Sequence, residues 1–233
     1  PAGLSAFKSD LKFFLKKKPQ IISCDMHQGY QSTAWARDLS SGYKVLEVQH
    51  HHSHIASCMA ESGMKNKRVI GVAFDGTGLG DDRSIWGGEF LVCDYRGYVR
   101  AAHLAEIALL GASQAIRKPW RLAAAWLFKL YKDRFLKLDN AFVRRINKKD
   151  WRILRKMQAA RFNTPLTSSM GRLFDAAASL ILAKYRSGSE GELAIELQRL
   201  ASGCQQRGRP LNFKIARHVG GYVVYPYALF KEI

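Results

Sequence analysis

The sequence of 233 residues predicts a mixed α/β or α+β protein. Short apolar segments typical of strands are interspersed with segments that have helical periodicity. Apolar residues make up 47 % and charged residues 24 % of the chain, which is the composition of a folded globular protein. No run of about 18 apolar residues occurs, so we expect no membrane-spanning helix and no membrane partner.

The cysteines and the N-terminus indicate the compartment. Cys24, Cys58, Cys93 and Cys204 stand far apart and form no CxxC pair, which disfavours a zinc finger and a disulfide scaffold. The first residues lack the apolar stretch of a signal peptide. We therefore expect a cytoplasmic protein with reduced thiols.

Five elements are predicted before residue 64, from apolar periodicity and from the breaks between periodic segments. Pro19 ends the first helix and Gly63 closes the last. In order, these elements are a helix over residues 4–15, a strand over 21–24, a helix over 32–39, a strand over 44–48 and a helix over 50–62.

Later elements are predicted in the same way. Residues 68–74 and 85–95 are expected to be strands around a loop rich in Gly and Asp, which is typical of a hairpin. Polar residues before an apolar helical stripe predict an N-cap at residues 167–169. The later elements are a helix from this cap to residue 186, a helix over 192–201 and a strand over 221–225.

The middle of the chain is strongly basic. Residues 111–162 hold fifteen Lys and Arg against three acids, and so carry +12 of the total charge of +18. Apolar residues recur there every three or four positions, which predicts two amphipathic helices. Because no nucleic-acid module is recognisable, we favour a solvated or protein-docking surface over a sequence-specific nucleic-acid partner.

The histidine cluster at residues 50–54 is the first candidate site. His50 and His54 are four residues apart, so on a helix they share a face and can bind one metal ion. The spacing does not name the metal. His51 stands where the metalloprotease motif H-E-x-x-H has its glutamate, so the general base of those enzymes is missing. The spacing favours a metal site over a surface cluster, and the internal position of the histidines disfavours an appended tag.

The second candidate follows the strand ending at Phe74. Asp75 at its end can ligate a metal or a metal-bound phosphate. Gly76, Gly78 and Gly80 alternate after it, which lets backbone N–H groups approach a phosphate. The segment lacks the Lys-Ser/Thr of a P-loop, and an ordinary tight hairpin explains it equally well.

The third candidate is the segment Thr167-Ser168-Ser169 and the helix after it. A helix N-terminus can hold an anion, and the Asp175 carboxylate can accept hydrogen bonds from a ribose. A plain N-cap with a buried Phe174 explains most of the same pattern.

Taken together, these segments resemble the C-terminal, carbamoyl-transferring domain of the HypF family of hydrogenase maturation proteins. The matching segments run in family order over nearly the whole chain. They include Cys24-Asp25-Met26-His27, Val48-Gln49-His50-His51-His52-Ser53-His54, Phe74-Asp75-Gly76-Thr77-Gly78, Trp86-Gly87-Gly88-Glu89, Lys118-Pro119-Trp120-Arg121, Ser168-Ser169-Met170-Gly171-Arg172-Leu173-Phe174-Asp175 and Glu190-Gly191-Glu192-Leu193.

The resemblance implies an actin-like, RNase-H-type ATPase fold. Residues 1–110 would form the first lobe, 111–165 a basic helical insertion and 166–233 the start of an incomplete second lobe. The family passes a carbamoyl group from an ATP-derived carbamoyl-adenylate to the C-terminal cysteine of the partner HypE, which leads to the cyanide ligand of nickel–iron hydrogenase.

The resemblance also assigns site residues. A divalent metal, iron or zinc, would be held by His50 and His54, with Asp75 as the third ligand. The nucleotide would be bound by the phosphate-lining Gly76, Thr77 and Gly78, by Asp175 at the ribose, and by Gly191 and Glu196.

This sequence departs from the family pattern in two ways. Gln28 and Gly29 replace a Pro-Asp pair, and the adenine-side loop and last metal-binding aspartate of the family have no counterpart. We therefore expect a fragment that is inactive alone and needs a separate chain for the missing lobe. The alternatives are a carbamoyltransferase acting on a small molecule or a tRNA, and a non-catalytic nucleotide- or RNA-binding remnant.

Overall fold

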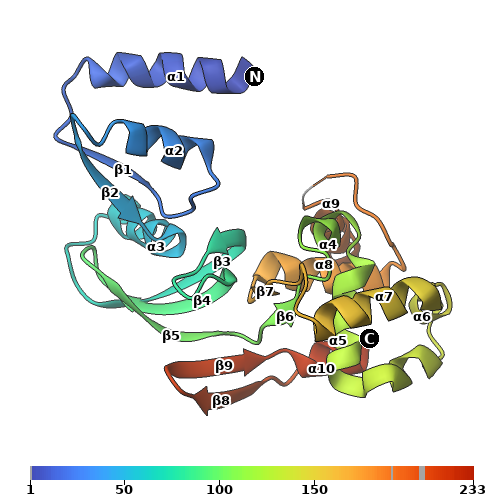
Figure 1. Ribbon diagram of the computed structural model, residues 1–233. Coiled ribbons are helices and arrows are strands. Elements are labelled where there is room, and N and C mark those ends of the chain that lie inside the picture. The colour runs from blue at the N-terminus through green and yellow to red at the C-terminus, as the bar shows by residue number, and fades with distance from the viewer. Residues whose placement is uncertain (1, 190, 205–207) are drawn as a thin grey trace.

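The computed structural model describes residues 2–189, 191–204 and 208–233. The N-terminal part contains a two-stranded parallel sheet (Figure 1). Its strands pair so that Asp25, the last residue of the first strand, lies beside Val48, the last residue of the second. The elements are α1 (Ala2–Leu15), β1 (Ile21–Asp25), α2 (Gln31–Asp38) and β2 (Lys44–Val48), and the sequence predicts each of them to within two residues.

Helix α3 (His50–Glu61) follows β2 directly and lies against the hairpin of β3 (Val69–Leu79) and β4 (Ile85–Cys93). The Gln49 side chain caps α3 by accepting a hydrogen bond from the His51 amide. Apolar side chains of α3 and the hairpin form a small core, made of Ile55, Met59, Ala73, Leu91 and Cys93. This core holds the histidine-bearing helix against β3.

The hairpin belongs to a seven-stranded mixed sheet. Strand β5 pairs antiparallel with β4, and β9 pairs parallel with β5. The glycine-rich segment expected to be the hairpin loop is instead the end of β3, which carries an irregularity between Phe74 and Gly78. The other strands are β5 (Tyr98–Leu104), β6 (Ile107–Ala108), β7 (Leu166–Thr167), β8 (Lys214–His218) and β9 (Gly221–Tyr225).

A helical body lies beside the sheet, on the opposite side from α1 and α2 (Figure 1). Its large core includes the buried Trp126, Phe135, Phe142 and Trp151. The expectation of two helices in the basic segment is wrong: the segment breaks into five short ones. These five are α4 (Ser113–Arg117), α5 (Trp120–Tyr131), the 3-10 helix η1 (Lys132–Lys137), α6 (Ala141–Arg144) and α7 (Lys148–Ala159). The later helices are α8 (Met170–Ile181), α9 (Glu192–Ser202) and α10 (Tyr227–Glu232).

One break in the basic segment and the early end of α8 have a local backbone cause. Pro119 separates α4 from α5, because proline lacks the amide hydrogen that a continuing helix would need. Helix α8 ends at Ile181 and not at the predicted Arg186, since the chain turns at Ala183 with a φ of +49°. None of the helices in the described residues is long and apolar enough to cross a bilayer.

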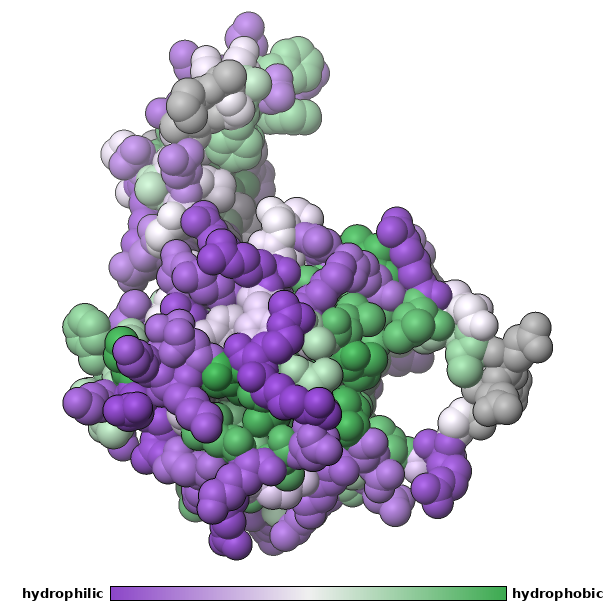
Figure 2. Space-filling model, turned by 90° about the vertical axis from the view of Figure 1, so that its right-hand side faces the viewer, coloured by the Kyte–Doolittle hydropathy of each residue, from purple (hydrophilic) through white to green (hydrophobic). Residues whose placement is uncertain are grey.

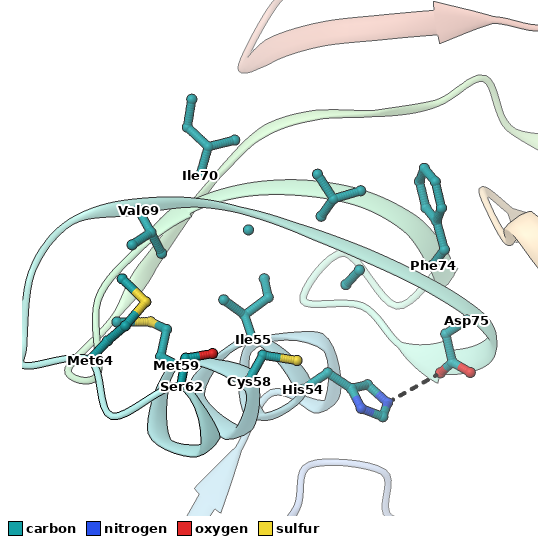
Figure 3. Close-up of a pocket in the computed structure, with 13 residues that line it drawn as sticks. His54, Ile55, Cys58, Met59, Ser62, Met64, Val69, Ile70, Phe74 and Asp75 are labelled. Carbon is teal, nitrogen blue, oxygen red and sulfur yellow. Dashed lines mark ion pairs between the residues drawn. The ribbon is translucent and has the colours of Figure 1, made fainter.

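One face of the sheet is not covered by any helix among the described residues. On β3, Ile70 and Phe74 point away from α3 (Figure 3). Together with Val72 they are largely exposed, at 75 % for Ile70, 51 % for Val72 and 53 % for Phe74. The strand register places apolar residues of four other strands on the same face, and they include Phe90, Val92, Val99, Ala102, Ile215, Tyr222 and Val224. We call these ten residues the open sheet face.

Candidate functional site

Three side chains from two elements converge beside the start of α3. His50 and His54 lie one turn apart on α3, and Asp75 lies on β3. His50 Nε2 is 3.2 Å from His54 Nε2 and 3.1 Å from Asp75 Oδ2, and His54 Nε2 is 4.0 Å from the same Asp75 oxygen. We call these three residues the His/Asp cluster.

Asp25 orients His50 from the opposite side. Its Oδ2 lies 2.7 Å from His50 Nδ1, and its carboxylate is 17 % exposed. A carboxylate at this nitrogen holds the proton on Nδ1, which leaves the lone pair of Nε2 directed at the cluster. Metal-ligating histidines in proteins usually have such a partner.

The donor set fits a divalent metal such as zinc or iron. Ligand bonds of about 2.0–2.1 Å in a tetrahedral site put neighbouring ligand atoms about 3.3 Å apart, close to two of the three distances here. Asp75 Oδ2 is buried and forms no hydrogen bond, which is costly for a carboxylate oxygen unless a cation satisfies it. Two facing imidazole nitrogens likewise share one proton at most. Three protein ligands leave a coordination position open for a substrate.

His51 packs between α3 and β3, next to the His/Asp cluster. It is fully buried, its Nδ1 lies 3.2 Å from Gln49 Oε1, and burial lowers its pKa. A Cβ on Gly78 would lie 2.5 Å from His51 Cε1, so only glycine fits at this position of β3. The glycine therefore sets how closely β3 approaches the histidines.

The start of α8 lies against the glycine-rich end of β3. Ser169 Oγ donates to the carbonyl oxygens of Asp75 and Gly76, at 2.8 Å each, and also accepts from the Arg172 amide as the N-cap. A Cβ on Gly171 would lie 2.8 Å from Gly76 Cα. The start of α8 is therefore fixed against the carbonyl oxygens of the β3 end, while the Gly76 amide donates to Asp75 Oδ1 at 2.6 Å.

A buried ion pair helps to hold the start of α8 against the sheet. Glu89 is completely buried on β4, and its Oε2 accepts a 2.6 Å hydrogen bond from Arg100 Nε on β5. Ser168 Oγ donates to Glu89 Oε1 at 2.5 Å, and the Arg100 guanidinium lies 4.0 Å from the centre of the Trp86 ring. The pair joins the two central strands to the residues just before α8.

The remaining predicted nucleotide residues lie elsewhere. Asp175 is buried in α8 and forms an ion pair with Arg172 at 3.1 Å. Gly191 is the N-cap of α9 with a φ of +75°, and Glu196 on α9 pairs with Lys184. Helix α9 is well separated from α3 (Figure 1). The structure thus brings together the His/Asp cluster and the segment of Gly76, Thr77 and Gly78, places Asp175 on the helix whose start contacts that segment, and leaves Gly191 and Glu196 apart at α9.

An apolar groove of about 530 Å³ runs from the cluster along α3 and β3. His54 and Asp75 lie at one end and Met64 and Val69 at the other, with Cys58 along its floor (Figure 3). The groove leads directly to the open side of the candidate metal site.

Three contributors were not singled out from the sequence: Asp25, Glu89 and Arg100. Asp25 directly follows the predicted strand over 21–24, but its contact with His50 depends on the parallel pairing of β1 and β2, which the structure shows. Glu89 and Arg100 had no sequence signal, since their pairing depends on the register of β4 and β5.

Comparison with known proteins decides the family. Residues 4–61 match the model of the HypF Kae1-like domain. Residues 71–233 match the model of the carbamoyltransferase Kae1-like domain, second subdomain. The chain belongs to the HypF family. The resemblance drawn from the sequence and the predicted fold class are both confirmed.

Individual HypF proteins are similar over most of this chain. Carbamoyltransferase HypF2 of Cupriavidus necator is 39 % identical over 214 residues, which is 91 % of this chain and 26 % of the relative. Carbamoyltransferase HypF of Synechocystis is 41 % identical over 193 residues, or 77 % of this chain and 25 % of the relative. The chain thus spans about a quarter of the length of these relatives.

Solved HypF structures have the same fold. A full-length HypF in a phosphate- and nucleotide-bound form matches 97 % of this chain with a TM-score of 0.85 and 36 % identity, using 29 % of its own length. HypF of T. kodakarensis matches 91 % of this chain with a TM-score of 0.76 and 31 % identity.

Proposed function

We propose that this chain forms part of a HypF carbamoyltransferase site. It would pass the carbamoyl group of carbamoyl-adenylate to the C-terminal cysteine of a HypE-type protein. The observation that carries the proposal is the convergence of His50 Nε2, His54 Nε2 and Asp75 Oδ2 next to the glycine-rich end of β3. The proposal divides the chain into a first lobe (1–110), a helical insertion (111–165) and part of a second lobe (166–233).

His50, His54 and Asp75 would hold an iron or zinc ion. Such an ion supplies Lewis acidity toward a phosphate or carbamoyl oxygen. Asp25 keeps the His50 proton on Nδ1, and His51 and Gly78 hold the two elements in register. Gly76, Thr77 and Gly78 would line the nucleotide phosphate. Asp175, Gly191 and Glu196 would act on the nucleoside side, with Asp175 at the ribose.

The transfer is a nucleophilic substitution at the carbamoyl carbon. The thiolate sulfur of the acceptor cysteine forms a bond to this carbon, and the bond from the carbon to the phosphate oxygen of adenylate breaks. The products are the thiocarbamate and AMP, and the thiol proton goes to solvent. The apolar groove beside His54 would exclude water, which otherwise competes with the thiol. Cys24, Cys58 and Cys93 are free thiols, which fits the reducing cytoplasm that we propose as the compartment.

Metal content and transfer are the two tests. Wild-type chain and a His54→Ala variant are reconstituted with zinc or iron and measured by elemental analysis, with His218→Ala on β8 as the control. We expect one ion per wild-type and control chain and loss of the ion in His54→Ala. Equal metal in all three would contradict the proposed site.

The transfer assay uses carbamoyl-adenylate and a HypE-type acceptor, with mass spectrometry of the acceptor's C-terminal peptide. We expect no turnover by this chain alone. Turnover is expected when the segments of a HypF relative outside the matched quarter are added as a second chain. Absence of modification in this mixture, with metal bound, would contradict carbamoyl transfer while leaving the metal site intact.

A further inference from the structure

The helical body contains a small cationic pocket apart from the His/Asp cluster. It has a volume of about 210 Å³ and lies where the loop after α8 meets the starts of α5 and α7. Asp150 is its one carboxylate among the described lining residues. Its four cations are Lys118, Arg121, Arg145 and Arg186.

Asp150 neutralises only part of the charge of these cations. Among the residues that the structure describes, none of the four is within ion-pair distance of a carboxylate, although Arg144 and Arg155 of the same segment pair with Asp139 and Asp133. With Asp150 counted, the lining carries a net charge of +3. Several like charges held around one cavity are unfavourable without a counter-ion, so the arrangement favours an anion.

Two of the guanidinium groups are held in place by the fold. Arg121 Nη1 donates to the Leu110 carbonyl at 3.0 Å, and its Nε is buried without a hydrogen-bond partner. Arg145 Nη1 donates to the Ala183 carbonyl at 2.9 Å, and its guanidinium lies 5.0 Å from the centre of the Tyr185 ring. Positioned guanidinium groups with free N–H donors bind oxyanions in a bidentate manner.

We infer that this pocket binds the phosphate group of a small molecule. A volume of about 210 Å³ is below the ~300–1,000 Å³ of sites that enclose drug-sized ligands, so it admits one oxyanion with its water and not a whole nucleotide. A lining charge of +3 matches a phosphate dianion better than a singly charged carboxylate. The phosphate is either free or the end of a small ester whose remainder lies outside.

The surroundings favour a small molecule over a nucleic acid. Figure 2 shows the helical side of the molecule, where hydrophilic side chains cover much of the surface. Single-strand binding uses exposed aromatic rings on which bases stack. Trp120, Trp126 and Trp151 are at most 8 % exposed. Phe162 is 69 % exposed but does not line the pocket, so the basic segment offers one exposed ring and not a row of rings for successive bases.

The test is calorimetric titration of the full chain with inorganic phosphate, phenyl phosphate, glutamate and a short RNA at physiological salt. The pocket variants are Lys118→Gln and Arg186→Gln, whose side chains make no hydrogen bond to any residue that the structure describes. The control is Arg152→Gln, an exposed cation on α7 outside the pocket. Thermal unfolding of each variant checks that the fold is kept.

We expect phosphate binding that weakens about tenfold or more in each pocket variant and less than twofold in the control. Tighter binding of phenyl phosphate than of phosphate would identify the end of an ester as the ligand, and equal binding would identify free phosphate. No phosphate binding, binding unchanged in the pocket variants, or preferred binding of glutamate would overturn the inference. RNA binding that depends on Lys118 and Arg186 and exceeds phosphate binding would overturn it in favour of a nucleic acid.

Discussion

Asp25 Oδ2 lies 2.7 Å from His50 Nδ1, although 25 residues separate the two in the sequence. The contact exists because β1 and β2 are parallel and end side by side, with Asp25 opposite Val48. The small N-terminal sheet therefore determines the orientation of the first histidine of α3. It also makes Asp25 a positioning residue that is testable apart from the ligands themselves.

Asp25→Asn removes the carboxylate charge with little change in shape. We expect metal affinity to fall about 10–100-fold, because the amide is a weaker acceptor for the Nδ1 proton. Zinc titration against a competing chelator measures the change. Glu47→Gln, at an exposed pair with Arg37, is the control and should leave affinity unchanged. Equal affinities in Asp25→Asn and wild type would remove Asp25 from the site.

Gly78→Ala tests the approach of β3 to the histidines. The new methyl group would meet His51 Cε1 at 2.5 Å and His50 Cδ2 at 3.2 Å, so the imidazoles must move. We expect weaker metal binding and a loss of about 1–3 kcal/mol in the free energy of unfolding. Gly97→Ala is the matched control, since no heavy atom lies within 4 Å of the place that its new methyl group would take. Behaviour of Gly78→Ala like the control would show that β3 does not constrain the cluster.

Glu89→Ala leaves Arg100 without its buried partner. Since the Glu89 side chain is 0 % exposed and that of Arg100 17 %, we expect a loss of about 3–5 kcal/mol, as for other broken buried pairs. Glu47→Ala breaks an exposed pair and should cost no more than about 1 kcal/mol. Urea unfolding of both variants gives the comparison. Similar midpoints for the two would mean that the buried pair does not hold α8 against the sheet.

Tyr185 predicts a pH dependence at alkaline pH. Burial raises the pKa of this phenol to about 12 from its ordinary value of 10.0, and its hydroxyl donates to the Phe142 carbonyl. A raised folded-state pKa contributes stability that is complete below pH 10 and is lost as the pH rises toward 12. The stability advantage of wild type over Tyr185→Phe should therefore shrink across this window. Parallel curves for the two proteins between pH 8 and 12 would contradict the assignment.

Local sequence patterns predict the helices and strands whose formation is determined by their own residues and not by their pairing partners. Strands β2 and β9 are short segments rich in Val, Leu and Tyr, and the structure has them at the predicted bounds, Lys44–Val48 and Gly221–Tyr225. Strand β5 contains Arg100 and His103 and lacks a clear alternation, so its pairing with β4 was not foreseen. Strands β6 and β7 have two residues each and exist only through their pairing partners. The pairing of these three strands is determined by the tertiary structure and not by the sequence of any short segment.

The candidate site likewise has one part that the sequence predicts and one part that it does not. The i, i+4 spacing predicts that His50 and His54 share a helix face, and the structure places them so, with their Nε2 atoms 3.2 Å apart. Their metal-binding role stays a prediction. Glu89 could not be assigned a partner, because Arg100 faces it only once the register irregularity between Phe90 and Leu91 is set. A bulge of one residue has no reliable sequence signal when the strand itself is not evident.

The open sheet face has a consequence for the colloidal behaviour of the chain. Residues such as Ile70 and Val99, 75 % and 67 % exposed, attract one another between molecules, whereas a net charge of +18 keeps the molecules apart. Salt shortens the range of this repulsion to about 8 Å at physiological ionic strength and leaves the apolar attraction in place. We therefore expect the chain to stay monomeric at low ionic strength and to associate as salt is added.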